Sequence, residues 1–178
     1  METIKVLDKE FRLYIPQEEI ETVIKDIACK INEDYRGKNP LFLVMLNGAF
    51  MFASQLFKEL DIDCETSFVK YSTYSGTQST CEVKELIGLN SSLEGRNIII
   101  VEDIIDSGFT MNCLLKKLKD MKVSSAKVAT MLFKPNAFQF DYKIDYVGMN
   151  IGNEFIVGYG LDYNEHGRNY ASIYKVVE

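Results

Sequence analysis

Basic residues, long apolar runs and targeting segments are all scarce in this sequence, and each shortage excludes a class of protein. The chain has 20 Lys and Arg residues against 26 Asp and Glu residues, which gives a formal net charge of −6. A broad nucleic-acid interface needs a basic face, so we expect no nucleic-acid partner. The most apolar window, residues 41–53, is interrupted by Asn47-Gly48 and is too short to span a bilayer. The amino end also lacks the pattern of a signal peptide, and we therefore expect a cytoplasmic protein without a membrane partner.

Cysteine and histidine are few, and their spacing does not suggest a metal site. The four cysteines are Cys29, Cys64, Cys81 and Cys113, and their wide scatter predicts reduced thiols in an intracellular protein. His166 is the only histidine, and we assign it no role.

No internal repeat and no Pro- or Ser-rich linker divides the 178 residues, so we expect a single domain over residues 1–178. Short apolar runs alternate with amphipathic stretches, which predicts an α/β fold. Strands are expected near residues 1–15, 41–46, 64–71, 82–87, 97–101, 126–133, 147–151, 155–159 and 171–177. Helices are expected at 16–35, at 50–60 and after Thr110. Parallel strands joined by such helices form a doubly wound sheet, which binds ligands at the carboxyl ends of its strands.

The most informative stretch is residues 97–110. Its apolar half predicts a strand that is buried on both faces and ends at Val101. Small residues in the following loop and the start of a helix leave backbone N–H groups free to bind an anion. Glu102, Asp103 and Asp106 would repel that anion unless a divalent metal or a sugar lies between them. The stretch therefore predicts a ligand with phosphate, hydroxyls and Mg²⁺, although a solvated acidic loop after a core strand is the alternative.

The run Val-Glu-Asp-Ile-Ile-Asp-Ser-Gly-x-Thr at residues 101–110 resembles the signature of the type I phosphoribosyltransferases. It is most similar to their 6-oxopurine branch, the hypoxanthine-guanine phosphoribosyltransferases. The resemblance implies a parallel sheet flanked by helices, with a small hood formed from about residues 1–15 and 150–178. It also implies purine salvage: transfer of the phosphoribosyl group from 5-phosphoribosyl 1-pyrophosphate (PRPP) to N9 of hypoxanthine or guanine, with Mg²⁺ as cofactor.

The resemblance also implies roles for the residues of this run. Glu102 and Asp103 would hold the two ribose hydroxyls, directly or through water bound to Mg²⁺. Asp106 would take the N7 proton of the base as N9 attacks. The loop around the 5′-phosphate would comprise Ile105, Asp106, Ser107, Gly108, Phe109 and Thr110. Ser107 stands where threonine is commoner in the family, and it keeps the hydroxyl.

Two further segments resemble pyrophosphate-binding parts of the family. Asn47-Gly48 would be a tight turn against pyrophosphate, and many members have Lys or Arg where this chain has Asn47. Without that charge, binding at this turn would depend on backbone N–H groups. Arg168 matches a residue that reaches pyrophosphate. From the residues alone, Asn47-Gly48 is equally compatible with a plain turn.

The base would be bound by residues from the carboxyl half of the chain. Lys134 would donate to the exocyclic oxygen of a 6-oxopurine, and the same ammonium would clash with the amino group of adenine. Phe155 would stack on the purine, the backbone of Ile156 would meet its edge, and Asp162 would hold a second Mg²⁺. The alternatives are a solvated Lys134, a Phe155 in the ordinary core and a surface ion pair between Asp162 and Arg168.

Residues 72–80 are nearly all small hydroxyl residues and resemble the family's flexible active-site loop, with Tyr74 over the substrate and Cys81 in place of a glycine. A hairpin tip is the alternative. Two other functions stay open: a sister transferase for xanthine, adenine or a pyrimidine, and a nucleotide-sensing RNA-binding regulator of the same fold. A homodimer or homotetramer is the expected assembly.

Overall fold

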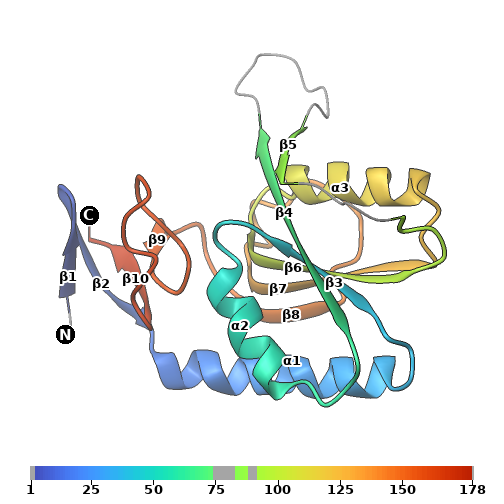
Figure 1. Ribbon diagram of the computed structural model, residues 1–178. Coiled ribbons are helices and arrows are strands. Elements are labelled where there is room, and N and C mark those ends of the chain that lie inside the picture. The colour runs from blue at the N-terminus through green and yellow to red at the C-terminus, as the bar shows by residue number, and fades with distance from the viewer. Residues whose placement is uncertain (1–2, 74–82, 88–91, 178) are drawn as a thin grey trace.

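The computed structural model describes residues 3–73, 83–87 and 92–177, which form two separate sheets and three helices (Figure 1). The helices are α1 (Gln17–Tyr35), α2 (Phe50–Glu59) and α3 (Phe109–Asp120). The strands are β1 (Thr3–Val6), β2 (Lys9–Ile15), β3 (Leu41–Met45), β4 (Glu65–Thr73), β5 (Val83–Ile87), β6 (Asn97–Ile105), β7 (Ser125–Phe133), β8 (Tyr146–Asn150), β9 (Ile156–Val157) and β10 (Ile173–Val176).

The larger sheet has the strand order β5-β4-β3-β6-β7-β8. All neighbouring strands are parallel except β5, which is antiparallel to β4. Helices α1 and α2 lie on one face of this sheet and α3 lies on the other (Figure 1). This is the doubly wound α/β arrangement that the sequence predicts.

The core forms because the central strands are apolar on both faces. Every residue of β3 is buried, and Ile98 to Val101 of β6 are completely buried. Helix α1 covers them with a stripe at three- and four-residue spacing, Ile20, Ile24, Ile27, Ala28 and Ile31. The helix expected at 16–35 is therefore present, and its apolar face packs on the sheet.

The prediction that the central strand ends at Val101 is wrong. Strand β6 continues to Ile105 because β7 stays paired with it that far, whereas its pairing with β3 ends where Val44 lies opposite Val101. The last four residues of β6 therefore have a strand on one side only. This half-paired end lies at the carboxyl edge of the sheet, and it carries the two adjacent acids.

The smaller sheet joins the two ends of the described chain in the order β1-β2-β10-β9. Its own core contains Val6, Phe11, Val157 and Tyr174. The sequence predicts one short strand in the first fifteen residues, but the structure has a hairpin of two. The strand expected at 155–159 is also shorter, because positive φ angles at Gly158 and Tyr159 end β9.

Three other expectations concern the loop at residues 72–81, the cysteines and membrane spans. The predicted loop over residues 72–81, with Tyr74, falls mostly outside the described residues. Cys29 and Cys64 are free thiols, but Cys113 is disulfide-bonded, so the prediction of reduced thiols is wrong for Cys113. Within the described part of the chain, the helices are too short or too polar to cross a membrane.

Candidate functional site

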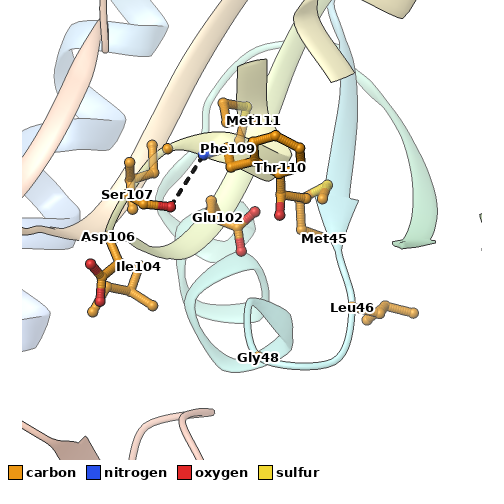
Figure 2. Close-up of a pocket in the computed structure, with 12 residues that line it drawn as sticks. Met45, Leu46, Gly48, Glu102, Ile104, Asp106, Ser107, Phe109, Thr110 and Met111 are labelled. Atoms are coloured by element: carbon orange, nitrogen blue, oxygen red, sulfur yellow. Dashed lines mark hydrogen bonds between the residues drawn. The ribbon is translucent and has the colours of Figure 1, made fainter. Parts of the chain in front are cut away.

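A cavity of about 280 Å³ opens at the carboxyl ends of β3 and β6 (Figure 2). The residues that line it are Met45, Leu46, Gly48, Glu102, Ile104, Ile105, Asp106, Ser107, Gly108, Phe109, Thr110 and Met111. Eight of them were expected from the sequence. The apolar remainder was not, because Met45, Leu46, Ile104 and Met111 look like ordinary core residues until the strand ends are placed side by side.

Glu102 and Asp103 put two carboxyl groups at the half-paired end of β6. Burial raises the pKa of Glu102 well above its usual range, and the neighbouring charge of Asp103 raises it further. Burial also raises the pKa of Asp103, against the lowering effect of hydrogen bonds from Glu102 and from the Ile104 N–H, the latter 2.9 Å from Oδ1. Two partly desolvated acids side by side disfavour charge unless hydroxyl donors or a cation stabilise it. The pair is therefore suited to a ligand that supplies hydroxyls or a metal.

The loop after the acids ends in a glycine that starts α3. Gly108 has φ of 83°, and a Cβ there would meet the Phe138 ring and the Tyr142 hydroxyl. Only glycine satisfies both conditions without strain. The first turn of α3 lines the cavity with Phe109, Thr110 and Met111. The Ser107 hydroxyl oxygen accepts a hydrogen bond from the Phe109 N–H at 3.4 Å (Figure 2). A helix N-terminus with small residues before it binds a phosphate group.

A second loop, residues 134–142, donates hydrogen bonds to backbone carbonyls within residues 105–108. The Lys134 N–H donates to Ile105 O at 2.9 Å, and the Gln139 N–H donates to Ser107 O at 3.1 Å. The Tyr142 hydroxyl donates to Gly108 O at 3.0 Å. Burial raises the pKa of Tyr142, and the charge of Glu102 adds to the effect, so the hydroxyl stays a donor. These hydrogen bonds fix the backbone of residues 105–108 where it lines the cavity.

Sequence reasoning missed Gln139 and Tyr142. The available signal was the alternation of aromatic residues after Lys134, at Phe138, Phe140 and Tyr142. The Phe138 ring packs edge to face with Phe140 and with Tyr142, and the Phe138 and Tyr142 centroids are 5.0 Å apart. The Phe140 and Tyr142 rings are stacked. The resulting cluster covers Gly108, a contact that no local pattern indicates.

Lys134 and Asp106 lie next to each other across the strand ends. Lys134 is 8% exposed, and its Nζ is 3.1 Å from Asp106 Oδ2. The alternative of a solvated Lys134 is therefore wrong. Asp106 is the outer member of the pair, with a side chain that is 55% exposed. A buried donor beside an accessible acceptor forms a two-point hydrogen-bonding edge.

The Asn47-Gly48 turn packs tightly into the site, which a plain turn does not require. A Cβ on Gly48 would overlap the Asp103 carboxylate, and a Cβ on Gly160 would overlap the Gly48 carbonyl. Two segments far apart in the sequence therefore touch the turn through glycine. The Asn47 side chain accepts a hydrogen bond from Lys70, at 3.1 Å.

Arg168 lies behind Gly160 and joins this segment to the acids. Its guanidinium donates to Gly160 O at 2.9 Å and pairs with Asp162 at 2.7 Å and Glu165 at 3.2 Å. The ion pair between Asp162 and Arg168 that the sequence left open is thus present. Arg168 also lowers the pKa of Asp103, so its charge is felt at the acid pair.

Ile156 begins β9 of the smaller sheet, and Phe155 directly precedes that strand. Phe155 is 45% exposed, so the alternative of an ordinary core residue is wrong. Its ring lies 5.7 Å from Tyr163 and 6.2 Å from Phe11, centroid to centroid. The backbone of Ile156 pairs with Lys175 in β10. An aromatic face fixed from behind and open in front is suited to stacking on a flat ring.

The described residues are compatible with magnesium on a phosphate-bearing ligand. Within residues 3–73, 83–87 and 92–177, no three His, Cys, Asp or Glu side chains form a group that could hold an ion. Mg²⁺ is commonly bound through one or two carboxylates together with substrate phosphates and water. Glu102 with Asp103, and separately Asp162, offer such partial ligand sets.

Comparisons with known proteins agree with this geometry. The family described as "Phosphoribosyl transferase domain" matches residues 15–164. The hypoxanthine-guanine phosphoribosyltransferase of Streptococcus thermophilus is 41% identical over 96% of this chain and 97% of its own length. The crystal structure of a hypoxanthine phosphoribosyltransferase from Staphylococcus aureus superposes with a TM-score of 0.89 at 36% identity, covering 93% of this chain and 91% of that one. A hypoxanthine-guanine phosphoribosyltransferase from Bacillus anthracis gives 0.88 at 36% identity, covering 93% and 98%.

Proposed function

Because this chain belongs to the phosphoribosyl transferase family, we propose that it is a purine salvage enzyme that makes IMP or GMP. It transfers the phosphoribosyl group of PRPP to N9 of hypoxanthine or guanine and releases pyrophosphate. The fold is the type I phosphoribosyltransferase fold, with the smaller sheet as the hood over the base.

The observation that supports this substrate class best is the Lys134–Asp106 pair, with its 3.1 Å separation. A 6-oxopurine carries an oxygen acceptor at position 6 beside position 7, which bears a proton in one tautomer. Lys134 donates to the oxygen while Asp106 accepts from N7–H. Adenine presents an amino donor at the same place, which an ammonium cannot accept. The pair therefore discriminates by chemistry as well as by shape.

The same pair performs the proton transfer. As the N9 lone pair attacks the anomeric carbon, the bond to pyrophosphate breaks and the leaving group takes the bonding electrons. The N7 proton moves to the Asp106 carboxylate, which restores the aromatic neutral base. Lys134 is buried and fixed by its own backbone bond to Ile105, so it holds Asp106 in position for this step.

The other groups bind and orient PRPP. The N–H groups at the start of α3 and the Ser107 and Thr110 hydroxyls hold the 5′-phosphate, and Glu102 and Asp103 hold the ribose hydroxyls. Asp162 and the Glu102–Asp103 pair would hold magnesium, which would supply charge neutralisation for the leaving pyrophosphate. Phe155 stacks on the purine and the Ile156 backbone meets its edge.

A base-competition assay tests the proposal. The protein is given PRPP, Mg²⁺ and equal amounts of hypoxanthine, guanine, xanthine, adenine and uracil, and the nucleotides are identified. IMP and GMP are the expected products. XMP alone would keep the chemistry and revise the pocket, and a folded protein that forms no nucleotide would overturn the enzyme assignment.

A variant pair tests the base contact within the same assay. Lys134→Gln should lose selectivity against adenine together with most turnover. Lys143→Gln is the matched control, since Lys143 lies at the end of the same loop region with a side chain that is 79% exposed. Equal selectivity in both variants would remove the role of Lys134. A dimeric or tetrameric assembly and a cytoplasmic location stay predictions, which sedimentation and fractionation would check.

A further inference from the structure

Lys70 of β4 lies beside the Asn47-Gly48 turn and is held there by the sheet. Strands β3 and β4 are parallel with Met45 opposite Val69, and one residue further on the Leu46 N–H donates to Val69 O at 2.8 Å. This register places Lys70 beside Leu46, at the start of the turn, and its Nζ lies 3.1 Å from the Asn47 amide oxygen. The contact thus follows from strand pairing rather than from a chance side-chain conformation.

The contact fixes the orientation of the Asn47 amide. An ammonium has only donors, so the oxygen of Asn47 must face Lys70 and its NH₂ group must point away. The acceptor is neutral, so this hydrogen bond does not neutralise the positive charge of Lys70, and within residues 3–73, 83–87 and 92–177 no salt bridge of Lys70 is found. The NH₂ group of Asn47 is therefore a hydrogen-bond donor that points away from Lys70 and lies next to its positive charge.

The turn also has a cation on its other side. Gly160 touches the Gly48 carbonyl, and Arg168 donates to Gly160 O at 2.9 Å. Arg168 is engaged with two carboxylates, those of Asp162 and Glu165, so part of its charge is already neutralised. Lys70 supplies the charge that a polyphosphate at this turn would otherwise lack.

We propose that Lys70 is a pyrophosphate-binding residue, supplying from β4 the positive charge that Asn47 does not carry at the turn. This inference rests on the proposed function, because it concerns the leaving group of that reaction. It replaces the expectation that backbone N–H groups alone bind pyrophosphate here. In this chain the positive charge is on the neighbouring strand rather than on the turn, and Asn47 is hydrogen-bonded to the residue that carries it.

Calorimetric binding of magnesium pyrophosphate tests this directly, without turnover. Lys70→Met should weaken pyrophosphate binding by about 10-fold or more, the usual cost of losing a hydrogen bond to a charged group. Lys70→Arg keeps the charge and should retain most of the affinity. Lys143→Met, at an exposed lysine far from the turn, is the matched control and should bind like the wild type.

A rescue experiment separates charge from structure. Asn47→Lys in the Lys70→Met background puts a cation on the turn itself and should restore affinity, which a loss of packing would not allow. The salt dependence of binding should also be shallower in Lys70→Met than in the wild type, because one charge contact is missing. Thermal unfolding of each variant shows whether the fold is intact.

The possible outcomes are distinguishable. A Lys70→Met variant with wild-type affinity and salt dependence would overturn the role of Lys70 while leaving the enzyme assignment in place. Weak binding without rescue by Asn47→Lys or retention by Lys70→Arg would reduce Lys70 to a structural residue. A wild-type protein that neither binds pyrophosphate nor forms nucleotide would overturn both proposals.

Discussion

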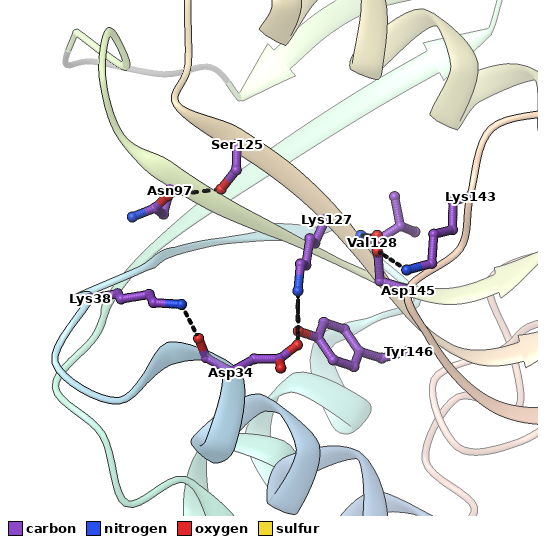
Figure 3. A network of polar contacts seen from close by, with 9 residues as sticks. All are labelled: Asp34, Lys38, Asn97, Ser125, Lys127, Val128, Lys143, Asp145 and Tyr146. Carbon is purple, nitrogen blue, oxygen red and sulfur yellow. Dashed lines mark hydrogen bonds and ion pairs between the residues drawn. The ribbon is translucent and has the colours of Figure 1, made fainter.

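Acidic side chains lie near both the amino ends and the carboxyl ends of the strands in the larger sheet, but the two groups of acids have different hydrogen-bonding partners. At the amino edge, Asp34 accepts from Lys127 at 2.8 Å and from Tyr146 at 2.6 Å (Figure 3). Asp145 accepts from the Val128 N–H at 3.0 Å and pairs with Lys143 at 3.2 Å. Hydrogen bonds from Lys127 and Tyr146 hold the pKa of Asp34 below its usual range, so the protein itself stabilises this negative charge.

At the carboxyl edge, Glu102 and Asp103 lie against each other and burial raises the pKa of both. The comparison separates two uses of acidic residues on one scaffold. Acids whose donors belong to the protein stabilise the strand ends. Acids that face each other at a half-paired strand end need donors from a ligand, and such groups concentrate at functional sites.

The largest expected effect is at Asp106, which lies at the carboxyl ends of the strands but is paired with Lys134. Asp106→Asn should keep the contact with Lys134 and lose the proton acceptor, lowering turnover by about 10²–10⁴-fold. Nucleotide affinity should stay nearly unchanged. Steady-state kinetics and direct IMP binding check this. Asp141→Asn, at an exposed acid in the following loop, is the control, and unchanged turnover in Asp106→Asn would remove the proton-transfer role.

A smaller effect is expected where the acid pair meets the turn. Gly48→Ala would place a methyl group on the Asp103 carboxylate, displacing an acid that we propose to orient the ribose. A misplacement of this kind costs about 10²-fold in kcat/KM. In Gly95→Ala, by contrast, the new Cβ has nothing within 4 Å and only its positive φ is strained; the control should lose stability and keep activity. Equal activities in the two variants would contradict the close packing at the site.

The hydrogen bond from Tyr142 to Gly108 O should have a modest effect on PRPP. Tyr142→Phe removes one hydrogen bond from a buried carbonyl, at a cost of about 1 kcal/mol, or roughly 5-fold in the KM for PRPP. The KM for hypoxanthine should change less, because Lys134 and Asp106 keep their own contacts. A variant in which only the hypoxanthine KM rises would assign Tyr142 to the base site instead.

The smallest effect should come from the amino edge. Asp34→Asn should leave kcat/KM unchanged and lower the free energy of unfolding by less than about 1 kcal/mol near neutral pH. The folded-state pKa of Asp34 lies below its unfolded value, so its contribution is present above about pH 4 and is lost as pH falls through the folded pKa. Denaturant titrations of both proteins across pH check this, with Asp26→Asn on the same helix as control. A stability difference that persisted in acid would contradict the charge-based account.

The sequence predicted the parts of the fold that depend on local pattern. The apolar runs at 41–46 and 126–133 and the helical stripe after Pro16 needed only periodicity and a helix start signal. The end of β6 could not be found in this way, since Glu102 to Ile105 stay in the strand through pairing with β7. Residues 102–105 do not encode that partner.

The same distinction applies to the residues of the candidate site. Residues within 101–110 could be found because the motif is continuous in the sequence. The contact of Lys70 with Asn47 could not, because it depends on the register between β3 and β4. The same holds for Tyr142, whose target Gly108 is far away in the sequence.

The pairing of β2 with β10 has a consequence for how the chain folds. Arg12 lies opposite Lys175 and Phe11 opposite Val176, so the smaller sheet closes only after nearly all of the described chain has emerged from the ribosome. Contacts of such long sequence separation form slowly. Until then the β1-β2 hairpin exposes an unpaired edge, which is open to pairing with another chain. Synthesis therefore completes residues 105–110 well before the smaller sheet can close. The β1-β2 hairpin is then the segment where we expect misassembly to begin.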